Sequence, residues 1–305
     1  MIVIEAIQRI VGPWLLLSDA AYYLPHTIFG LIRTRNWSSL FCWSRFQSVW
    51  FGRFWSYMGP QVRKAVEPVV VPLLKGRVSH GRLLADDEEL ETAPLPLSGS
   101  VIEVGAGSGM WVSLFKEIGF ETASIASSVN ASSNVRHRKP EASDIASTSG
   151  GITKIYGVEP NESNHTALSR RVFEAGMEDV YEIVPLGIED VGAANIPKVD
   201  CIVTVLCLCS IPSPQENIRA LYGYLKPHGR MYVFEHVCNR KHWSIYLYQK
   251  FINLFWPYMV GGCELQRDTG RYLRDAAPWS NIDLSPLANE PWFQAVPHVV
   301  GVLTK

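Results

Sequence analysis

Residues 101–109 read Val-Ile-Glu-Val-Gly-Ala-Gly-Ser-Gly, a short apolar run that leads directly into a glycine-rich turn. The run is typical of a buried strand, and the glycines allow a ligand to approach the backbone because no Cβ stands in the way. The spacing is G-x-G-x-G rather than G-x-G-x-x-G, and such a loop alone discriminates weakly between a ligand site and a tight turn. The stretch predicts a strand–turn–helix unit. Its turn is either a ligand site or a tight turn without a ligand.

Further short apolar runs follow and predict the rest of a sheet. They occupy residues 154–158, 181–185, 200–206 and 229–235. Helical patterns such as 164–174 and 214–225 separate most of them. Alternating strands and helices imply a mainly parallel sheet that is covered on both faces. Residues 281–287 and 298–303 predict a closing antiparallel pair. The predicted fold class is therefore α/β.

An acidic residue follows the second predicted strand, in Gly157-Val-Glu159-Pro-Asn161. An acid at that position points into the crevice beside the glycine loop, where it accepts both hydroxyls of a ribose. The usual gap is about 20 residues, whereas Glu159 follows Gly109 by 50 (159 minus 109). Residues 121–151, rich in Ser, Ala and Asn, predict a flexible surface insertion that accounts for the excess. This explanation requires the insertion to precede the second strand.

Composition limits the classes of function. The chain has 305 residues with 47% apolar and 19% charged residues, which excludes disordered and collagen-like classes. The net charge of −1 provides no field for nucleic acid, and we expect no nucleic-acid partner. The six cysteines show no CxxC pair and no Cys/His spacing typical of zinc. We therefore expect no metal site, and reduced thiols in a protein that faces the cytosol.

The first 35 residues are apolar but interrupted. Glu5, Arg9 and Asp19 place charges in the run, and Pro13 and Pro25 are expected to break it. No uninterrupted stretch approaches the roughly 20 residues of a spanning helix, and the acidic residues fit a secretory signal poorly. Two alternatives remain: a helix that lies on a membrane surface, or a helical cap packed on the protein itself.

Aromatic residues are concentrated in the following segment. A set spaced for one helical face comprises Trp43, Phe46, Trp50, Phe54 and Tyr57. This aromatic stripe either packs onto the catalytic domain or also covers an apolar pocket or contacts lipid. Gly59-Pro60 is expected to end its helix, and Pro68 a second short one. The acidic run Asp86 to Glu91 predicts a surface linker. We expect an aromatic helical cap over 1–94 and a catalytic domain over 95–305.

The glycine loop, Gly157–Asn161 and Val199–Leu206 together resemble class I S-adenosylmethionine-dependent methyltransferases. Residues 206–237, 262–276 and 297–305 narrow the resemblance to the methyltransferase-like protein 7 group, membrane-associated enzymes that act on small thiols. The Leu208-Cys-Ser tripeptide is among its most specific pieces. The resemblance implies a seven-stranded Rossmann-like core and S-adenosylmethionine as cofactor.

The resemblance also implies roles for individual residues. The glycine loop, with Ala106, would pass beneath the methionine part of the cofactor, and Glu103 would orient its amino group. Glu159 and Pro160 would serve the ribose. The adenine and methyl positions would be contacted by Gly187, Ile188, Glu189, Thr204, Val205 and Leu206.

Candidate catalytic residues follow from the chemistry of methyl transfer. A thiol or phenol acceptor must lose a proton, for which a histidine is suitable. His236 follows the fifth predicted strand, at the edge where open α/β sheets bind ligands. A structural role for His236 stays open, and Asp268 is a second candidate. We expect Cys207 and Cys209 to fill the core or brace a turn. A substrate lid is expected to include Trp243, Tyr246, Phe255 and Trp256.

The predicted function is methylation of a small apolar molecule, with sulfur favoured over oxygen or nitrogen, in secondary metabolism or detoxification. The alternatives are a cofactor-binding protein that catalyses a non-methylating, pericyclase-like step, and a membrane-surface module with a degenerate site. We expect a cytoplasmic protein, with peripheral contact to the cytosolic face of an internal membrane left open. The acceptor and the oligomeric state are not specified by the sequence.

Overall fold

The computed structural model describes residues 2–85, 88, 94–119 and 151–305. The predicted insertion at 121–151 lies outside these residues except for its last position. Most of the predicted acidic linker at 86–91 lies outside them as well.

A seven-stranded sheet forms the centre of the described chain. Its strands lie in the order β5-β4-β3-β6-β7-β9-β8. Their bounds are β3 Gly99–Val104, β4 Ile152–Val158, β5 Tyr181–Val184, β6 Val199–Val205, β7 Leu225–His236, β8 Asn281–Pro286 and β9 His298–Thr304. Only β9 pairs antiparallel with its neighbours β7 and β8. The predicted α/β fold and its closing antiparallel pair are confirmed. Strand β3 pairs directly with β4, which begins at Ile152, after the residues of the predicted insertion.

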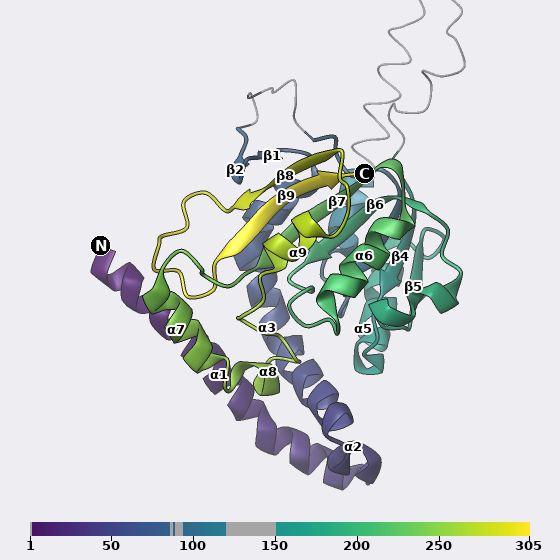
Figure 1. Ribbon diagram of the computed structural model, residues 1–305. Coiled ribbons are helices and arrows are strands. Elements are labelled where there is room, and N and C mark those ends of the chain that lie inside the picture. The colour runs from purple at the N-terminus through teal and green to yellow at the C-terminus, as the bar shows by residue number, and fades with distance from the viewer. Residues whose placement is uncertain (1, 86–87, 89–93, 120–150) are drawn as a thin grey trace, which may run out of the picture.

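Helices cover both faces of this sheet (Figure 1). One face packs against the end of α3 (Trp43–Leu74), the helix at 112–119 and α5 (Glu162–Ala175), burying Leu74, Phe115 and Leu168. The other face packs against α6 (Pro214–Tyr224) and α9 (Thr269–Asp275), burying Leu221 and Leu273. The alternation of strands and helices in the sequence therefore produces the expected three layers.

The N-terminal helices are longer than the sequence predicted. Helix α1 runs unbroken from Ile2 to Arg33 through Pro13 and Pro25. Helix α3 likewise continues through Gly59 and through three prolines, Pro60, Pro68 and Pro72. The expected breaks at these residues are wrong. An internal proline costs a helix about 3 kcal/mol, and burial of the helix faces offsets this cost here.

Packing between α1 and α3 accounts for the aromatic stripe. The Phe46, Trp50 and Phe54 side chains are buried between the two helices. The Trp50 indole donates a hydrogen bond of 2.8 Å to the Ala20 carbonyl. Trp43 and Tyr57, at the stripe's ends, remain 52% and 54% exposed. The middle of the stripe therefore mainly holds α1 and α3 together, whereas the packing interpretation expected it to pack onto the catalytic domain.

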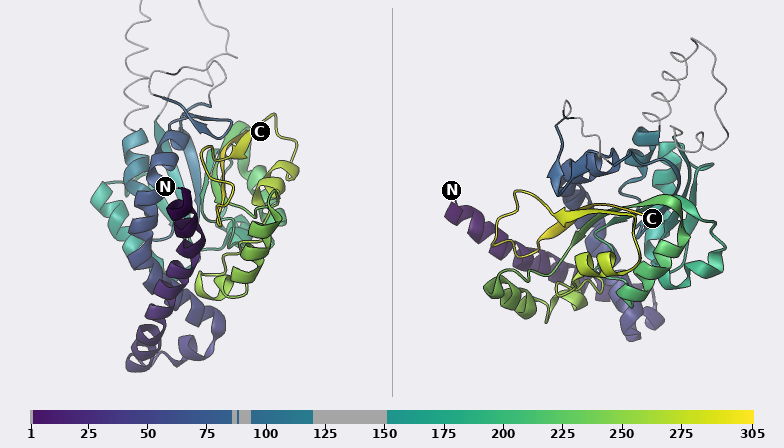
Figure 2. Two further views of the ribbon diagram at one scale, coloured as in Figure 1. Left: turned by 90° about the vertical axis from the view of Figure 1, so that its left-hand side faces the viewer. Right: turned by 45° about the horizontal axis from the view of Figure 1, so that its top comes forward.

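Two short helices lie along α1, beyond the edge of the sheet (Figures 1 and 2). They are α7 (Trp243–Ile252) and α8 (Trp256–Met259). The Trp14 ring lies 5.8 Å from the ring of Phe251 and 6.2 Å from that of Phe255. Helix α2 (Trp37–Phe41) connects α1 and α3 at the far end, and β1 (Val78–Ser79) with β2 (Arg82–Leu83) forms a small hairpin. The α1–α3 pair thus reaches over the edge of the sheet where β3, β4 and β6 end.

Candidate active site

A cavity of about 730 Å³ lies between the carboxyl ends of the parallel strands and the N-terminal helices. Its size falls within the range of about 300–1,000 Å³ that is usual for small-molecule and cofactor sites. Strand β3 lies between β4 and β6, so the chain order reverses here, and such a switch point is where open α/β sheets bind ligands. Helices α1 and α3 supply the opposite wall, including Leu16 and Trp55.

The glycine loop borders this cavity. Gly105, Gly107 and Gly109 all have positive φ, at +72°, +56° and +83°. A Cβ on Gly105 would lie 2.4 Å from the Cys207 sulfur, so the close approach of the two segments requires glycine. A Cβ on Gly107 would have no described atom nearer than 3.9 Å. Since Gly107 lines the cavity, a side chain there would project into it.

The Glu159 carboxylate braces this loop from the end of β4. Its Oε2 accepts a hydrogen bond of 2.7 Å from the backbone N–H of Gly107. Its Oε1 accepts from the Asn161 N–H at 2.9 Å and from the Asn164 side-chain amide at 3.2 Å. A carboxylate has about four acceptor positions, and these contacts fill three of them. The remaining position lies on a group that lines the cavity and suits a ribose hydroxyl. The sequence did not indicate Asn164.

Replacing Glu159 with alanine should weaken S-adenosylmethionine binding about 10- to 100-fold, measured by calorimetry. Hydrogen bonds to a charged group contribute about 1.5–3 kcal/mol, and about 1.4 kcal/mol corresponds to a tenfold change in affinity. The substitution removes the ribose acceptor and also frees the Gly107 N–H. Glu162→Ala, at an exposed position in the first turn of α5, is the matched control. Wild-type affinity in Glu159→Ala would refute the assignment of the ribose to this carboxylate.

Glu103 lies behind the glycine loop rather than in the cavity wall. The Tyr181 hydroxyl donates a hydrogen bond to its Oε2, and Gly157 leaves room for that hydroxyl because a Cβ would lie 2.2 Å from it. Burial raises the pKa of Glu103 to about 8, with Tyr181 opposing the rise and the Glu159 charge adding to it. Its buried Oε1 has no hydrogen-bond partner among the described residues. Such an orphaned acceptor fits a bridging water, because Glu103 does not line the cavity itself.

The Glu103→Gln variant should lose much of the pH dependence of stability between pH 5 and 8. A carboxyl whose pKa rises to about 8 on folding binds more protons folded than unfolded, so the free energy of unfolding falls as pH rises through that window. Because one pKa unit corresponds to 1.36 kcal/mol, the expected effect reaches about 4 kcal/mol. Urea unfolding at several pH values measures it. The exposed Glu178→Gln is the control, and an unchanged slope in Glu103→Gln would contradict the assignment.

The other predicted cofactor residues divide into two groups. Pro160, Gly187, Ile188, Glu189, Val205 and Leu206 line the cavity, as Gly105, Gly107 and Glu159 do. Glu103, Ala106, Gly109 and Thr204 do not. Gly109 instead supports the turn, because a Cβ there would lie 2.8 Å from Leu168 Cδ1. The first group is therefore placed to touch a ligand, whereas the second does not border the cavity.

Helix α3 contributes an apolar wall that the sequence did not assign. Phe51 and Trp55 line the cavity and stack on each other with ring centroids 5.2 Å apart. Phe51 and Trp55 are four residues apart, which places them on one face of α3 beside the aromatic stripe. This spacing is the sequence signal that could have identified a second aromatic face. Trp256 and Val260 line the same part of the cavity. Of the expected lid residues, Trp256 is buried there, whereas Trp243 is 76% exposed.

His236 lines the cavity at the end of β7, three strands from β4, which Glu159 follows, and it contacts a thiol. Its Nε2 is 2.9 Å from the Cys263 sulfur, and Cys209 and Cys263 both line the cavity beside it. Burial lowers the pKa of His236, but the Cys209 thiol and the Glu235 carboxyl raise it, and the net direction is upward. The prediction of no metal site overlooked this grouping, because the fold rather than the spacing brings the three side chains together.

Asp268, the second candidate catalytic residue, does not lie in the cavity wall with His236. Its carboxylate forms a 2.8 Å ion pair with Arg240, which is largely exposed, and Asp268 does not line the cavity. The Asp268 position therefore does not support its predicted role in acid–base chemistry at the site.

Comparison with known proteins agrees with this geometry. A sequence profile described as "Methyltransferase domain" matches residues 79–276. Thiol S-methyltransferase TMT1B of Rattus norvegicus is 28% identical over 158 residues, which are 50% of this chain and 62% of that protein. Thiol S-methyltransferase TMT1A of Homo sapiens is 27% identical over 153 residues, with the same coverage. The chain thus spans less than two thirds of the length of these relatives.

Among solved structures, an O-methyltransferase family protein from Burkholderia thailandensis has a TM-score of 0.49 and 12% identity, covering 98% of this chain and 72% of that one. The profile match extends over more than half of this chain and includes the glycine loop, Glu159 and His236. The chain therefore belongs to the methyltransferase domain family.

Proposed function

We propose that this protein transfers a methyl group from S-adenosylmethionine to a small apolar thiol. The observation that carries the proposal is that one cavity joins the glycine loop to an apolar end lined by Phe51, Trp55 and Trp256, where His236 and Cys263 lie. An apolar enclosure favours an apolar acceptor and excludes water. The similarity to proteins named thiol S-methyltransferases supports sulfur as the acceptor atom.

The residues have separate tasks in this proposal. Gly105 and Gly107 let the backbone approach the methionine part of the cofactor, and Glu159 holds the ribose. The cofactor supplies an electrophilic methyl group. The wall of Phe51 and Trp55 positions the acceptor and keeps water away, so that the two reactants meet in a fixed orientation. His236 lies at the acceptor end of the cavity, where the acceptor thiol must lose its proton.

A paired-acceptor assay tests the proposal. Purified full-length protein is incubated with methyl-labelled cofactor and with matched pairs of acceptors, such as thiophenol with phenol and an alkyl thiol with its alcohol. We expect labelled methyl thioethers and stoichiometric S-adenosylhomocysteine from the thiols, with much less product from the alcohols. Equal or faster methylation of phenol would contradict the choice of sulfur, and cofactor binding without turnover of any acceptor would contradict methyl transfer.

We further propose that the protein rests on a membrane surface through α1 and α7. Two stripes of exposed apolar side chains run along these neighbouring helices. They are Ile4, Ile7, Leu15, Tyr22 and Phe29 on α1, and Trp243, Leu247 and Phe251 on α7, each more than half exposed. Within the described part of the chain, α1 is also the one helix long and apolar enough to cross a membrane, by length and composition alone. Its packing against α3 and Phe251 favours an interfacial position.

Substituting aspartate for Ile7, Leu15 and Leu247 together should release the protein from vesicles of phosphatidylcholine and phosphatidylserine. Full burial of one large apolar side chain contributes about 1.5–3 kcal/mol, so the partition coefficient should fall at least about 100-fold. Co-sedimentation measures the bound fraction. The control carries the same change at exposed apolar positions on other surfaces, Leu83, Leu95 and Phe173. Equal loss of binding in both variants would contradict a defined membrane face.

A further inference from the structure

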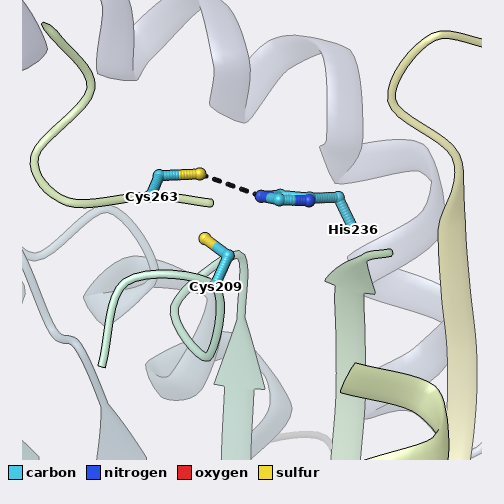
Figure 3. A group of neighbouring side chains, drawn as sticks. All are labelled: Cys209, His236 and Cys263. Atoms are coloured by element: carbon cyan, nitrogen blue, oxygen red, sulfur yellow. Dashed lines mark hydrogen bonds between the residues drawn. The ribbon is translucent and has the colours of Figure 1, made fainter. Parts of the chain in front are cut away.

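Three side chains with metal-binding atoms converge at the acceptor end of the cavity (Figure 3). Cys209 lies in the turn after β6, His236 is the last residue of β7, and Cys263 follows α8. Their ligand atoms all lie within 4.8 Å of one another, and all three residues are buried. Figure 3 shows the two sulfur atoms and the imidazole directed toward a common point.

The spacing of these atoms is close to that around one zinc ion. Zinc binds sulfur at about 2.3 Å and imidazole nitrogen at about 2.0–2.1 Å, so two ligands of a tetrahedral ion are about 3.5–3.8 Å apart. The cluster spans at most 4.8 Å and has one shorter pair, His236 Nε2 and Cys263 Sγ at 2.9 Å. Movements of about 1 Å or less convert this arrangement into a coordination sphere.

The surroundings of Cys263 include a hydrogen-bond donor that suits a thiolate ligand. The Trp256 indole donates a hydrogen bond of 3.2 Å to the Cys263 sulfur, and an indole N–H can only donate. Such a bond stabilises a sulfur that carries negative charge, as neighbouring donors do for metal-bound thiolates. Two thiolates and one imidazole form a donor set that suits zinc among the common divalent ions.

The same three residues line the cavity that Gly107 and Glu159 also line. A tetrahedral ion with three protein ligands keeps one position open, and in catalytic zinc sites that position receives water or substrate. Here the open position faces the cavity, because the cluster forms part of its wall.

We propose that Cys209, His236 and Cys263 bind one zinc ion, and that the acceptor thiol becomes its fourth ligand. The second half of this inference rests on the proposed function. The acceptor thiol loses its proton to solvent when its sulfur coordinates the ion, so His236 acts as a ligand and not as the base. The sulfur lone pair then forms the bond to the methyl carbon. The sulfonium C–S bond breaks, its electron pair stays on the departing sulfur, and both products are neutral thioethers.

Metal content tests the first half. Full-length protein is purified with zinc and a phosphine reductant, dialysed, and analysed by mass spectrometry for metals. We expect about one zinc per chain in wild type, and binding at least about 100-fold weaker in Cys209→Ser, Cys263→Ser and His236→Gln. Cys238→Ser, a buried cysteine outside the cluster, should retain the metal. A zinc-free wild type, or equal retention in all variants, would overturn the site.

A second measurement needs no substitution and therefore does not depend on the folding of variants. Zinc should protect Cys209 and Cys263 of the wild-type protein from alkylation, and removal of zinc by a chelator should expose them. The exposed Cys42 should react equally in both states. A Cys209–Cys263 disulfide in the phosphine-treated protein, or alkylation that ignores zinc, would overturn the proposal.

Cobalt substitution tests the second half. The cobalt-loaded protein should show sulfur-to-cobalt charge transfer, and thiophenol, but not anisole, should change this absorption. An unchanged spectrum would overturn the ligand role of the acceptor, whereas the proposed metal site itself would stand. Full-rate methylation of thiols by zinc-free protein would also overturn the ligand role of the acceptor, but it would leave the proposed function intact. A zinc-loaded protein that methylates no thiol would instead overturn the proposed function.

Discussion

Gly107→Val should raise the dissociation constant for S-adenosylmethionine at least about 1,000-fold, corresponding to about 4 kcal/mol. Gly107 has φ of +56°, a conformation that costs a residue with a side chain about 1–2 kcal/mol and is especially unfavourable when the side chain is β-branched. The new isopropyl group would also enter the cavity, because no described atom lies within 3.9 Å of the position of its Cβ. Strain and occupation of the ligand's space therefore act together.

Calorimetry on the full-length protein measures this change, and circular dichroism verifies that the variant folds. Gly223→Val is the matched control. Gly223 lies exposed in α6, and a Cβ there would meet no atom within 4 Å, so cofactor affinity should be unchanged. A folded Gly107→Val protein that binds the cofactor like wild type would show that the glycine loop does not hold it.

Phe54→Ala and Trp55→Ala should have opposite phenotypes although the residues are adjacent. Phe54 is 0% exposed between α1 and α3. Its truncation should lower the free energy of unfolding by about 3–5 kcal/mol and leave the KM of an apolar thiol nearly unchanged. Trp55 lines the cavity, and its truncation should lower kcat/KM for apolar thiols about 10- to 100-fold, since it removes about 1.5–3 kcal/mol of apolar contact.

Chemical unfolding and steady-state kinetics on the same two preparations separate these effects. A small polar thiol serves as the second substrate, and Trp55→Ala should affect it less than the apolar one. If Phe54→Ala raised KM for the apolar thiol while Trp55→Ala did not, the aromatic stripe, and not its neighbouring face, would form the acceptor wall.

The strands and the cofactor end of the site could be predicted from sequence because their signals are local. A buried strand, its glycine turn and Glu159 occupy short contiguous stretches, and parallel pairing brings their ends together. The continuity of α1 through Pro13 and Pro25 could not be predicted, because packing partners distant in the sequence offset the local cost of proline.

The acceptor end was harder to predict for the same reason. Cys209, His236 and Cys263 lie 27 residues apart in succession, too far for any local zinc pattern. They meet only because the turn after β6, the end of β7 and the segment after α8 converge at one edge of the sheet. His236 could be placed at that edge from its strand, whereas its two sulfur neighbours required the tertiary structure.

The contact between α1 and α7 has a consequence for synthesis on the ribosome. The Tyr248 hydroxyl donates to the Ile10 carbonyl, a partner 238 residues earlier in the chain. Because translation adds about 5–20 residues per second, α7 is complete only about 10–50 s after α1 has been synthesised. During that interval α3 can cover one face of α1, whereas the face that α7 later covers has only lipid or a chaperone to contact. We therefore expect the nascent chain to adsorb to a bilayer before its catalytic domain folds, so that the site assembles at the place where apolar acceptors dissolve.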